Sequence, residues 1–453
     1  MSDKRTSTPD CSSRRDFLKT STAAGALSLT TPYFFTSKAA ANESKNDRFN
    51  VAAIGVGGRG RGIGKELQGR GNCVAVCDVD RLHAEKFRGE DSKIQIYEDY
   101  RQLLDRKDID LVTIGTPDHW HTPILLDALQ AGKDVYCEKP LTLTVDEGKI
   151  INRAVQQSGR IVQVGTQQRS EFGQLFLQAV AIAHSGRLGK IKKLRVGIGG
   201  TTPGGPYKVQ TPPKHFNWDM WLGQAPQTDY IPERTHWGFR WWYEYSGGKM
   251  TDWGAHHVDI AQWAIGVTDA SALTIEPLEV THPVEFKNGY PTDTTSFNTA
   301  TKFKVRCTYP GGVEMIIQDE ENGVLIEGDK GRIFVNRGKI VGKPVEEIFG
   351  NKDKEIPRNE EKVEELRQQV AALFAGREPK RHMDNFIDAV KDRELPISDV
   401  FSHHRALTTC HLANIAMRLG RKITWDSDTQ LTDDDEINTQ WLKREQRTGY
   451  EFG

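Results

Sequence analysis

A short apolar run that ends in a glycine-rich turn is the feature that most constrains this chain. Residues 51–54 read Val-Ala-Ala-Ile, and Gly55, Gly57 and Gly60 follow in a G-x-G-x-x-G pattern. In such a turn the first glycine permits the bend, the second lets the backbone approach a pyrophosphate, and the third lets the next helix pack closely. The pattern therefore predicts a strand, a tight turn and a helix whose N-terminus faces phosphate groups.

An acidic residue at the end of the next apolar run sharpens this prediction. Asp78 follows residues 73–77, at the spacing where a carboxylate accepts hydrogen bonds from a ribose 2′-hydroxyl. Because the same charge repels a 2′-phosphate, NAD is favoured over NADP. Gly58 and Arg59, which lie inside the turn, are expected cofactor contacts as well. A glycine-rich loop without a ligand is the alternative, and it is disfavoured because strand, turn and acid all fall at the required spacings.

The first forty residues have the character of an export signal. Residues 13–19 read Ser-Arg-Arg-Asp-Phe-Leu-Lys, a modestly apolar stretch follows over residues 23–35, and residues 39–41 are alanines. We expect a twin-arginine signal peptide over residues 1–41, recognised by the twin-arginine export machinery and removed as the protein reaches the periplasm or the outside. The alternative is a membrane anchor, but the apolar stretch is shorter than the roughly 20 residues of a membrane span, so no stable insertion is expected.

Charge and length limit the remaining classes of protein. The chain has 453 residues, with 61 basic and 62 acidic side chains, and no run of like charge forms a basic stripe. Nucleic acid is therefore not expected as a partner. The length is enough for two domains.

Alternating strands and helices predict a doubly wound parallel sheet, a Rossmann domain, over residues 49–166. The expected strands lie at 49–54, 73–77, 111–114, 134–137 and 161–164, and the expected helices at 82–87, 100–104, 123–129 and 145–157.

Beyond residue 166 the pattern changes to that of an α+β domain with a large, mostly antiparallel sheet. Its expected strands lie at 190–198, 272–280, 295–307, 313–318, 324–327 and 332–336, and its expected helices at 174–184 and 251–265. We assign residues 167–425 to this domain, with late helices over 381–420, a solvated excursion at 343–365 and a C-terminal tail over 426–453. The predicted fold class is therefore α/β with this second domain.

Two short motifs contain candidate catalytic residues. Glu138-Lys139-Pro140 follows the strand expected at 134–137, at the edge where open α/β sheets bind ligands. The Lys139 ammonium can stabilise negative charge on a substrate oxygen and lower the pKa of a neighbouring base. A surface Lys-Pro turn is the alternative for this motif taken alone.

The second motif places Asp252 and His256 four residues apart, on one face of the helix expected at 251–265. His256 can accept a hydroxyl proton near neutral pH, and Asp252 can orient the imidazole or hold the substrate. An amphipathic helix with ordinary capping residues is the alternative.

Together these motifs resemble the Gfo/Idh/MocA oxidoreductases, which are sugar and inositol dehydrogenases. The glycine turn, Thr-Pro-Asp-His-Trp-His at 116–121, Glu-Lys-Pro at 138–140 and Asp252-x-x-x-His256-x-x-Asp259 follow in the same order and spacing. The resemblance implies that Lys139, Asp252 and His256 form the catalytic trio. It also implies dimers or tetramers. The resemblance places Gly55, Gly57, Gly60, Asp78, Thr116, Pro117, His121 and Glu138 on the cofactor side. Gly58, Arg59 and Gln168 are expected to bind the cofactor as well.

An aromatic stretch before the second motif is expected to bind substrate. Trp237 and Trp241 offer flat faces for sugar rings, and Arg240 can bind hydroxyls or a carboxylate. Domain core or a subunit contact is the alternative for about half of these aromatic residues. Arg169 and His257 complete the expected substrate side.

Metal binding is not expected from the sequence. His119 and His121 could combine with His256 and His257 as ligands, but the four histidines form no closed set with familiar spacing. Hydride transfer in the family that the chain resembles needs no metal.

These observations predict an exported, NAD-dependent enzyme that oxidises a secondary hydroxyl of a sugar, glycoside or polyol. Free NAD is scarce outside the cytoplasm, so the cofactor is expected to bind before export and to stay tightly bound. One alternative is an NAD-dependent, redox-neutral glycoside hydrolase that acts through a keto intermediate. A second alternative is a non-catalytic protein that binds a sugar or nucleotide, because fold alone does not fix function.

Overall fold

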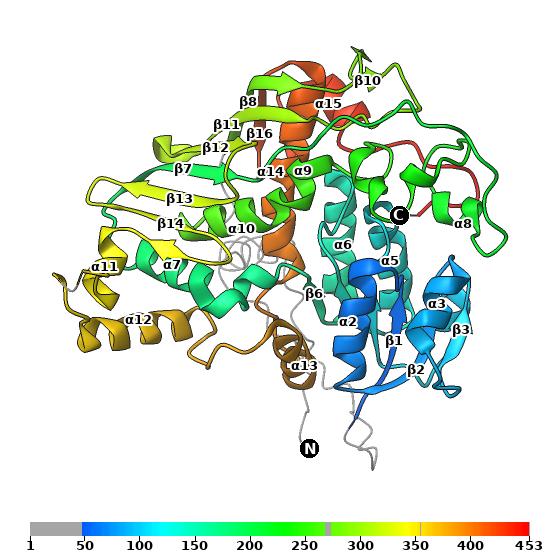
Figure 1. Ribbon diagram of the computed structural model, residues 1–453, viewed down its shortest axis with the longest axis horizontal. Coiled ribbons are helices and arrows are strands. Elements are labelled where there is room, and N and C mark those ends of the chain that lie inside the picture. Colours follow the sequence, from blue (N-terminus) through cyan, green and yellow to red (C-terminus); the bar gives the residue numbers. More distant parts are fainter. Residues whose placement is uncertain (1–47, 268–272, 354, 453) are drawn as a thin grey trace, which may run out of the picture. The chain divides into compact units, whose positions relative to one another are not determined.

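The structure is a computed structural model that describes residues 48–267, 273–353 and 355–452 (Figure 1). The expected signal peptide at 1–41 lies outside the described residues. Among the residues described, no helix combines the length and the apolar character needed to cross a membrane.

The N-terminal part of the described chain is a parallel sheet of six strands in the order β3-β2-β1-β4-β5-β6. This is the strand order of dinucleotide-binding domains. The strands are β1 (Asn50–Ile54), β2 (Asn72–Cys77), β3 (Gln95–Tyr97), β4 (Leu111–Ile114), β5 (Asp134–Cys137) and β6 (Val162–Val164). The doubly wound sheet is thus confirmed, and the edge strand β3 was missed because it has only three residues and none is fully buried.

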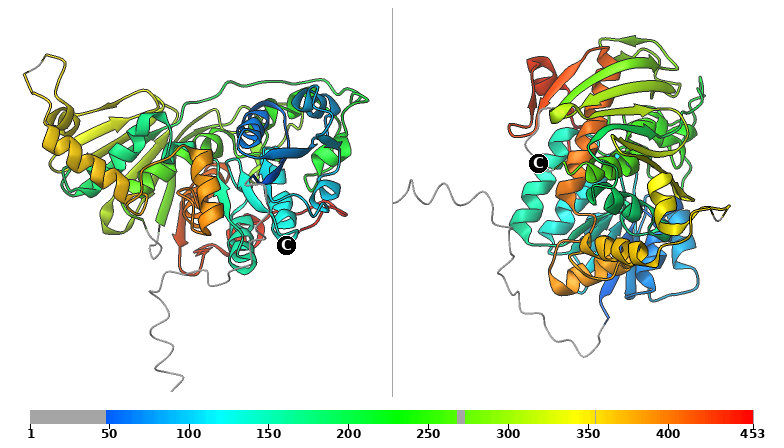
Figure 2. Two further views of the ribbon diagram at one scale, coloured as in Figure 1. Left: turned by 90° about the horizontal axis from the view of Figure 1, so that it is seen from below. Right: turned by 90° about the vertical axis from the view of Figure 1, so that its left-hand side faces the viewer.

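Helices cover both faces of this sheet (Figures 1 and 2). One face packs on α4 (Tyr100–Leu104), α5 (His121–Gln130) and α6 (Val145–Ser158); the other packs on α2 (Gly58–Gln68), α3 (Arg81–Arg88) and α13 (His382–Asp392). Helix α13 places Met383 and Phe386 against Val51 and Leu111, so the chain returns to the nucleotide-binding sheet late in the sequence.

The second sheet has nine strands in the order β15-β14-β13-β7-β12-β11-β8-β16-β17. Only the β7–β12 pair is parallel among its described strands, so the expected mostly antiparallel sheet is confirmed. Its strands are β7 (Ile191–Gly197), β8 (Leu273–Thr281), β11 (Lys302–Thr308), β12 (Glu314–Gln318), β13 (Gly323–Gly328), β14 (Arg332–Val335), β15 (Ile340–Val341), β16 (Ile423–Asp426) and β17 (Leu431–Thr432). A separate hairpin pairs β9 (Phe286–Lys287) with β10 (Tyr290–Pro291).

Helices α7 (Leu175–His184), α10 (Gly254–Ala264) and α14 (Val400–Leu419) pack against this sheet and share one core with it. Figure 2 shows these helices gathered on one side of the strands. Helix α14 also packs on α6 and β6 of the first sheet. Helix α10 carries His256 and packs on α14, and α14 in turn packs against elements of both sheets. The helix that carries His256 is therefore held to the nucleotide-binding sheet by shared packing.

Two segments expected to lack regular structure are ordered. Residues 343–365 contain α11 (Lys343–Phe349) and the start of α12 (Glu360–Ala372). The Glu- and Lys-rich exterior of α12 hid a buried stripe formed by Val363, Leu366 and Val370. Residues 426–452, expected as a tail, contain β17 and α15 (Asp435–Gln440), and β17 belongs to the nine-stranded sheet.

The glycine-, proline- and tryptophan-rich segment between β7 and α9 (Gly248–Asp252) has a small core of its own. Trp218, Trp221, Trp242 and Tyr245 are buried together there, and α8 (Trp218–Leu222) is its regular helix. This core positions the aromatic stretch that precedes the second chemical motif.

Candidate active site

The glycine turn closes tightly between β1, α2 and the residues that follow β4. Gly55 has φ of 73°, and a Cβ there would lie 2.6 Å from the backbone nitrogen of Thr116. A Cβ on Gly60 would lie 1.9 Å from the carbonyl oxygen of Gly55. Within the described chain no side chain caps α2, so its first N–H groups are open to an anion.

Asp78 stands directly beside this turn. Its Oδ2 accepts a hydrogen bond of 2.8 Å from Val56 N, and its Oδ1 accepts one of 2.9 Å from Asp80 N. Both carboxylate oxygens are therefore fixed in place at the end of β2. A carboxylate held there is suited to accept hydrogen bonds from ribose hydroxyls.

A single cavity of about 870 Å³ connects the glycine turn with the two chemical motifs. Its volume is at the upper end of the range for small-molecule sites, roughly 300 to 1,000 Å³. The predicted residues that line it are Gly55, Gly57, Gly58, Arg59, Asp78, Thr116, Pro117, His121, Glu138, Lys139, Trp237, Arg240, Asp252 and His256.

Lys139 and Asp252 form a close ion pair in this cavity. Lys139 Nζ lies 2.5 Å from Asp252 Oδ1 and donates a second bond of 2.9 Å to the Asp252 carbonyl. Arg240 Nε lies 3.6 Å from the same Oδ1. Burial opposes ionisation of Asp252, but the charges of Lys139 and Arg240 outweigh burial and lower the pKa of its carboxyl. The carboxyl is therefore ionised at neutral pH and holds the ammonium in position.

The helix expected over 251–265 is split at Trp253. Asp252 is the last residue of α9, and His256 lies in the first turn of α10. The expected arrangement on one continuous helical face is therefore wrong, although both side chains still line the same cavity.

Burial, together with the charges of Lys139 and Arg337, lowers the pKa of His256 well below its usual value. Its Nδ1 is buried and has no hydrogen-bond partner among the described residues. His256 is thus a neutral imidazole with an unused nitrogen.

Glu138 and His121 form hydrogen bonds that connect the segments following β4 and β5. Glu138 Oε1 accepts bonds from Arg59 Nε at 2.8 Å and from Gln167 Nε2 at 3.1 Å. The ring of His121 lies 2.7 Å from the Pro140 carbonyl and 2.9 Å from the Thr116 carbonyl. These contacts fix the loops after β4 and β5, from which Lys139 extends.

Four predicted site residues that carry side chains do not line the cavity: Gln168, Arg169, Trp241 and His257. Arg169 forms two bonds with the Asp259 carboxylate, at 2.7 and 2.6 Å. The structure therefore places Gln168, Arg169 and His257 in the packing around α10, and Trp241 beside Lys249 of α9. Gly60 also lies outside the lining, and it acts through its close approach to Gly55.

His257 and the two earlier histidines have separate partners. His257 Nδ1 lies 3.2 Å from Gln168 Nε2, and its Nε2 lies 2.8 Å from Asn322 Oδ1. His119 is buried with its Nε2 2.9 Å from the Trp221 carbonyl.

Asp118 and Arg337 are among the cavity residues that were not predicted from the sequence. Asp118 is buried, accepts a bond of 2.5 Å from Ser246 Oγ, and has a pKa that burial raises to about 7. Arg337 lies after β14 and stacks over the rings of Trp253 and Phe172. Asp118 lies inside the 116–121 segment, so the sequence motif could have identified it as a site residue. Arg337, in contrast, reaches the cavity only through the fold of the second sheet.

Two known protein families together match most of the chain. A family described as "Oxidoreductase family, NAD-binding Rossmann fold" matches residues 49–166. Its partner, "Oxidoreductase family, C-terminal alpha/beta domain", matches residues 203–452.

Curated relatives share parts of the chain. Inositol 2-dehydrogenase 2 of Saccharopolyspora erythraea is 26% identical over 307 residues, covering 65% of this chain and 70% of the relative. A glycosyl hydrolase family 109 protein of Shewanella pealeana is 36% identical over 159 residues, covering 30% of this chain and 35% of the relative. This match thus spans about a third of that relative. The inositol 2-dehydrogenase of Salmonella typhimurium is 34% identical over 119 residues, which cover 26% of this chain and 35% of the relative.

Solved structures share the fold. The WlbA dehydrogenase of Chromobacterium violaceum, solved with NADH and UDP-GlcNAcA, has a TM-score of 0.57 and 17% identity, covering 84% of this chain and 97% of that chain. The aldose-aldose oxidoreductase of Caulobacter crescentus, solved with glycerol, has a TM-score of 0.51 and 17% identity, covering 83% and 99%.

Proposed function

Because the chain belongs to the Gfo/Idh/MocA family of NAD-binding oxidoreductases, we propose that it oxidises a secondary hydroxyl of a sugar, glycoside or polyol. One observation carries the proposal. The glycine turn and Asp78 line one end of a single cavity, and Lys139, Asp252 and His256 line the other. The relatives named inositol 2-dehydrogenase support a polyhydroxylated substrate.

The residues of the first end fit a dinucleotide. Any side chain at Gly55 or Gly60 would fill the turn, so backbone is the only surface available to a phosphate there. The buried Thr116 Oγ1, which lines the same cavity, has no hydrogen-bond partner within residues 48–267, 273–353 and 355–452. We assign the pyrophosphate to the turn and the adenosine ribose to Asp78. When bound, NAD supplies a two-electron oxidant for a substrate C–H bond.

The residues of the second end supply proton transfer and charge. His256, a neutral imidazole that lines the cavity, accepts the proton of the substrate hydroxyl. The Lys139 ammonium stabilises the negative charge that develops on that oxygen. Asp252 holds Lys139 through the 2.5 Å contact and keeps it pointing into the cavity. Burial excludes water, which strengthens each of these interactions.

We also propose that the protein is exported by the twin-arginine route with NAD already bound. Residues 13–19 support this proposal, and the twin-arginine route carries folded proteins. A cofactor retained in this way is reoxidised in place, by a second sugar or by the later step of a redox-neutral reaction. We expect the protein to be a homo-oligomer.

A second candidate is redox-neutral glycoside cleavage. Relatives named glycosyl hydrolase family 109 protein and alpha-N-acetylgalactosaminidase favour it. In such a reaction a ketone acidifies the neighbouring C–H bond, the glycosidic oxygen leaves by elimination, water adds to the double bond, and reduction of the ketone restores the hydroxyl.

Product analysis separates these candidates. Purified protein is mixed with NAD and a panel of sugars, glycosides and polyols, and both reduced nicotinamide and released sugars are measured. A keto product with reduced nicotinamide supports the dehydrogenase. Released sugar with no net change in nicotinamide supports the glycosidase. Sugar binding that persists in Lys139→Ala, with no turnover in the parent protein, would instead indicate a non-catalytic binder.

A further inference from the structure

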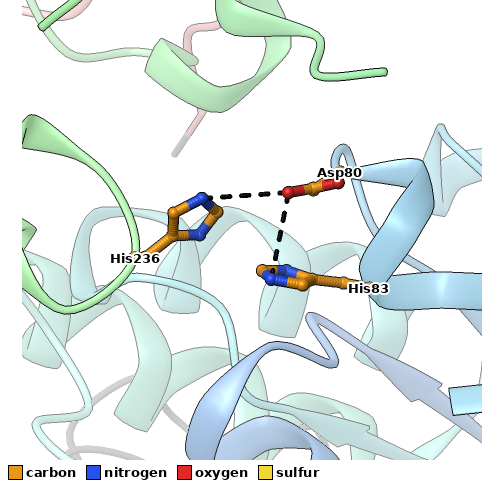
Figure 3. A group of neighbouring side chains, drawn as sticks. All are labelled: Asp80, His83 and His236. Carbon is orange, nitrogen blue, oxygen red and sulfur yellow. Dashed lines mark ion pairs between the residues drawn. The ribbon is translucent and has the colours of Figure 1, made fainter. Parts of the chain in front are cut away.

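Three side chains with metal-binding atoms meet at the wall of the cavity, away from the reactive end. Asp80 caps the N-terminus of α3, His83 lies in the first turn of that helix, and His236 comes from the segment before α9. Figure 3 shows one Asp80 oxygen facing both imidazole rings. That atom, Oδ2, lies 3.9 Å from His83 Nε2 and 3.8 Å from His236 Nε2. The three ligand atoms all lie within 4.8 Å of one another.

The two oxygens of Asp80 have different environments. Oδ1 accepts bonds of 3.0 Å from both Leu82 N and His215 Nδ1. Oδ2 faces the two histidines of the cluster. The carboxylate is therefore fixed on one side and presents a single oxygen on the other, as a monodentate metal ligand does.

His83 is oriented by a second carboxylate. Its Nδ1 lies 3.6 Å from Asp78 Oδ2, while its Nε2 faces Asp80. A proton on Nδ1 is favoured by Asp78, which leaves the lone pair of Nε2 directed at the cluster. Ligating histidines commonly have this arrangement, with a carboxylate behind the ring nitrogen that does not bind the metal.

His236 reaches the cluster from an unusual backbone conformation. Its φ is 50°, in the left-handed region that a histidine rarely occupies. Residues are held in such conformations where the surrounding structure or a function requires it. Here the conformation turns the ring, which is half exposed, toward Asp80.

We propose that Asp80 Oδ2, His83 Nε2 and His236 Nε2 bind one divalent transition-metal ion, with Zn²⁺ the best fit and water completing the coordination. Donor atoms about 2.1 Å from a tetrahedral ion lie about 3.3 Å from one another. The Asp80 contacts exceed this by little more than half an ångström, a distance that rotation of two partly exposed rings can close. Two imidazole nitrogens favour such an ion over Mg²⁺ or Ca²⁺, which prefer oxygen.

The position of the site gives the ion a structural consequence. It joins α3, on the nucleotide-binding sheet, to the segment that carries Trp237 and Arg240. The ion therefore ties one wall of the cavity to the other. This inference does not depend on the reaction, although His83 lies beside Asp78, to which we assign the adenosine ribose. It differs from the histidine pairing considered from the sequence, which involved His119, His121, His256 and His257.

Metal titration tests the proposal. The full chain, purified without a histidine tag, is stripped with a chelator and titrated with Zn²⁺ and separately with Mg²⁺ by calorimetry. We expect one saturable equivalent of Zn²⁺ and no heat from Mg²⁺. His236→Asn, which tolerates the same backbone conformation, and His83→Gln are each expected to weaken Zn²⁺ binding at least about 100-fold.

His184→Ala is the matched control, because His184 is exposed, lies outside the cluster, and has its Nε2 2.8 Å from the Trp263 carbonyl. It is expected to bind Zn²⁺ as the parent protein does. Far-UV circular dichroism verifies that each variant is folded. Absence of a one-equivalent Zn²⁺ site in the parent protein, or Zn²⁺ affinity in both cluster variants equal to that of the parent protein, overturns the proposal. Because the readout is the metal alone, failure here leaves the proposed oxidoreductase activity unaffected.

Discussion

The two ends of the cavity are built in different ways. The dinucleotide end comes from a short stretch of chain, from β1 to Asp78, and its surface is mostly backbone. The reactive end joins Lys139 to Asp252, 113 residues later in the sequence, and its working parts are charged or titratable side chains. The first end therefore depends on close steric approach, and the second on electrostatics in a buried setting.

This difference predicts which substitutions separate binding from turnover. Added volume at the dinucleotide end blocks the cofactor, whereas a removed charge at the reactive end leaves the cofactor in place and stops the chemistry. Four substitutions test the contrast, and the largest effect is expected at the reactive end.

Lys139→Met removes the ammonium that stabilises negative charge on the substrate oxygen. We expect kcat/KM to fall by about 10³-fold, the range for loss of one oxyanion-stabilising group. NADH affinity, measured by fluorescence titration, is expected to stay unchanged. Lys249→Met is the control, because Lys249 is nearby on α9 but its ammonium lies over the Trp241 ring, outside the residues that line the cavity. If Lys139→Met lost NADH affinity as strongly as turnover, the predicted separation of cofactor binding from chemistry would be contradicted.

Gly60→Ala places a Cβ 1.9 Å from the Gly55 carbonyl oxygen, so the turn has to shift. Overpacking of this kind costs about 1 to 3 kcal/mol. NADH binding is therefore expected to weaken by about 10- to 100-fold. Gly62→Ala, in the same helix, meets its nearest atom at 3.8 Å and is expected to bind NADH normally. The same fluorescence titration measures both variants, and equal affinity for NADH would show that the tight turn is not required.

Asp118→Asn tests a buried carboxyl that the charges of Lys139, Arg240 and Asp252 reach. Because burial raises its pKa to about 7, its stabilising contribution is fully present below its ordinary pKa and is lost as pH rises through about 7. We expect the stability of the parent protein relative to the variant to fall by about 2 kcal/mol between about pH 5 and about pH 8. The amide keeps an acceptor for Ser246 Oγ. Urea unfolding at the two pH values gives the difference, and a constant difference would contradict the shifted pKa.

Asp78→Asn tests charge at the dinucleotide end, where we expect the smallest effect. Removing the carboxylate removes repulsion of a 2′-phosphate, which is worth about 1 to 4 kcal/mol near a protein surface. The ratio of NADPH to NADH affinity is expected to rise by about tenfold. Competitive fluorescence titration measures this ratio. An unchanged ratio would show that Asp78 does not select the cofactor.

The sequence predicted the dinucleotide end better than the reactive end, for a physical reason. The turn and Asp78 are consecutive features of one βαβ unit, so spacing alone places them together. At the reactive end, the motifs identified Lys139, Asp252 and His256, but not the break of the helix at Trp253.

Side chains that depend on tertiary packing were predicted least well. Arg169 carries a charge and follows the first domain, but its partner Asp259 lies 90 residues further on, and their ion pair removes it from the cavity. Arg337 reaches the cavity because β14 is folded into the second sheet, and no local motif marks it. The apolar stripe of α12 was concealed because most of its exterior is charged or polar, with glutamate, lysine, arginine and glutamine.

The most direct test of the central claim is a single-turnover experiment on the purified protein loaded with NAD. Reduced nicotinamide is followed by its near-ultraviolet absorbance after addition of a sugar, glycoside or polyol. We expect reduction that saturates at one nicotinamide per chain in the parent protein, and bound but unreduced NAD in Lys139→Met. Failure of the parent protein to bind NAD, or equal reduction in both proteins, would contradict a single cavity that joins cofactor and reactive residues.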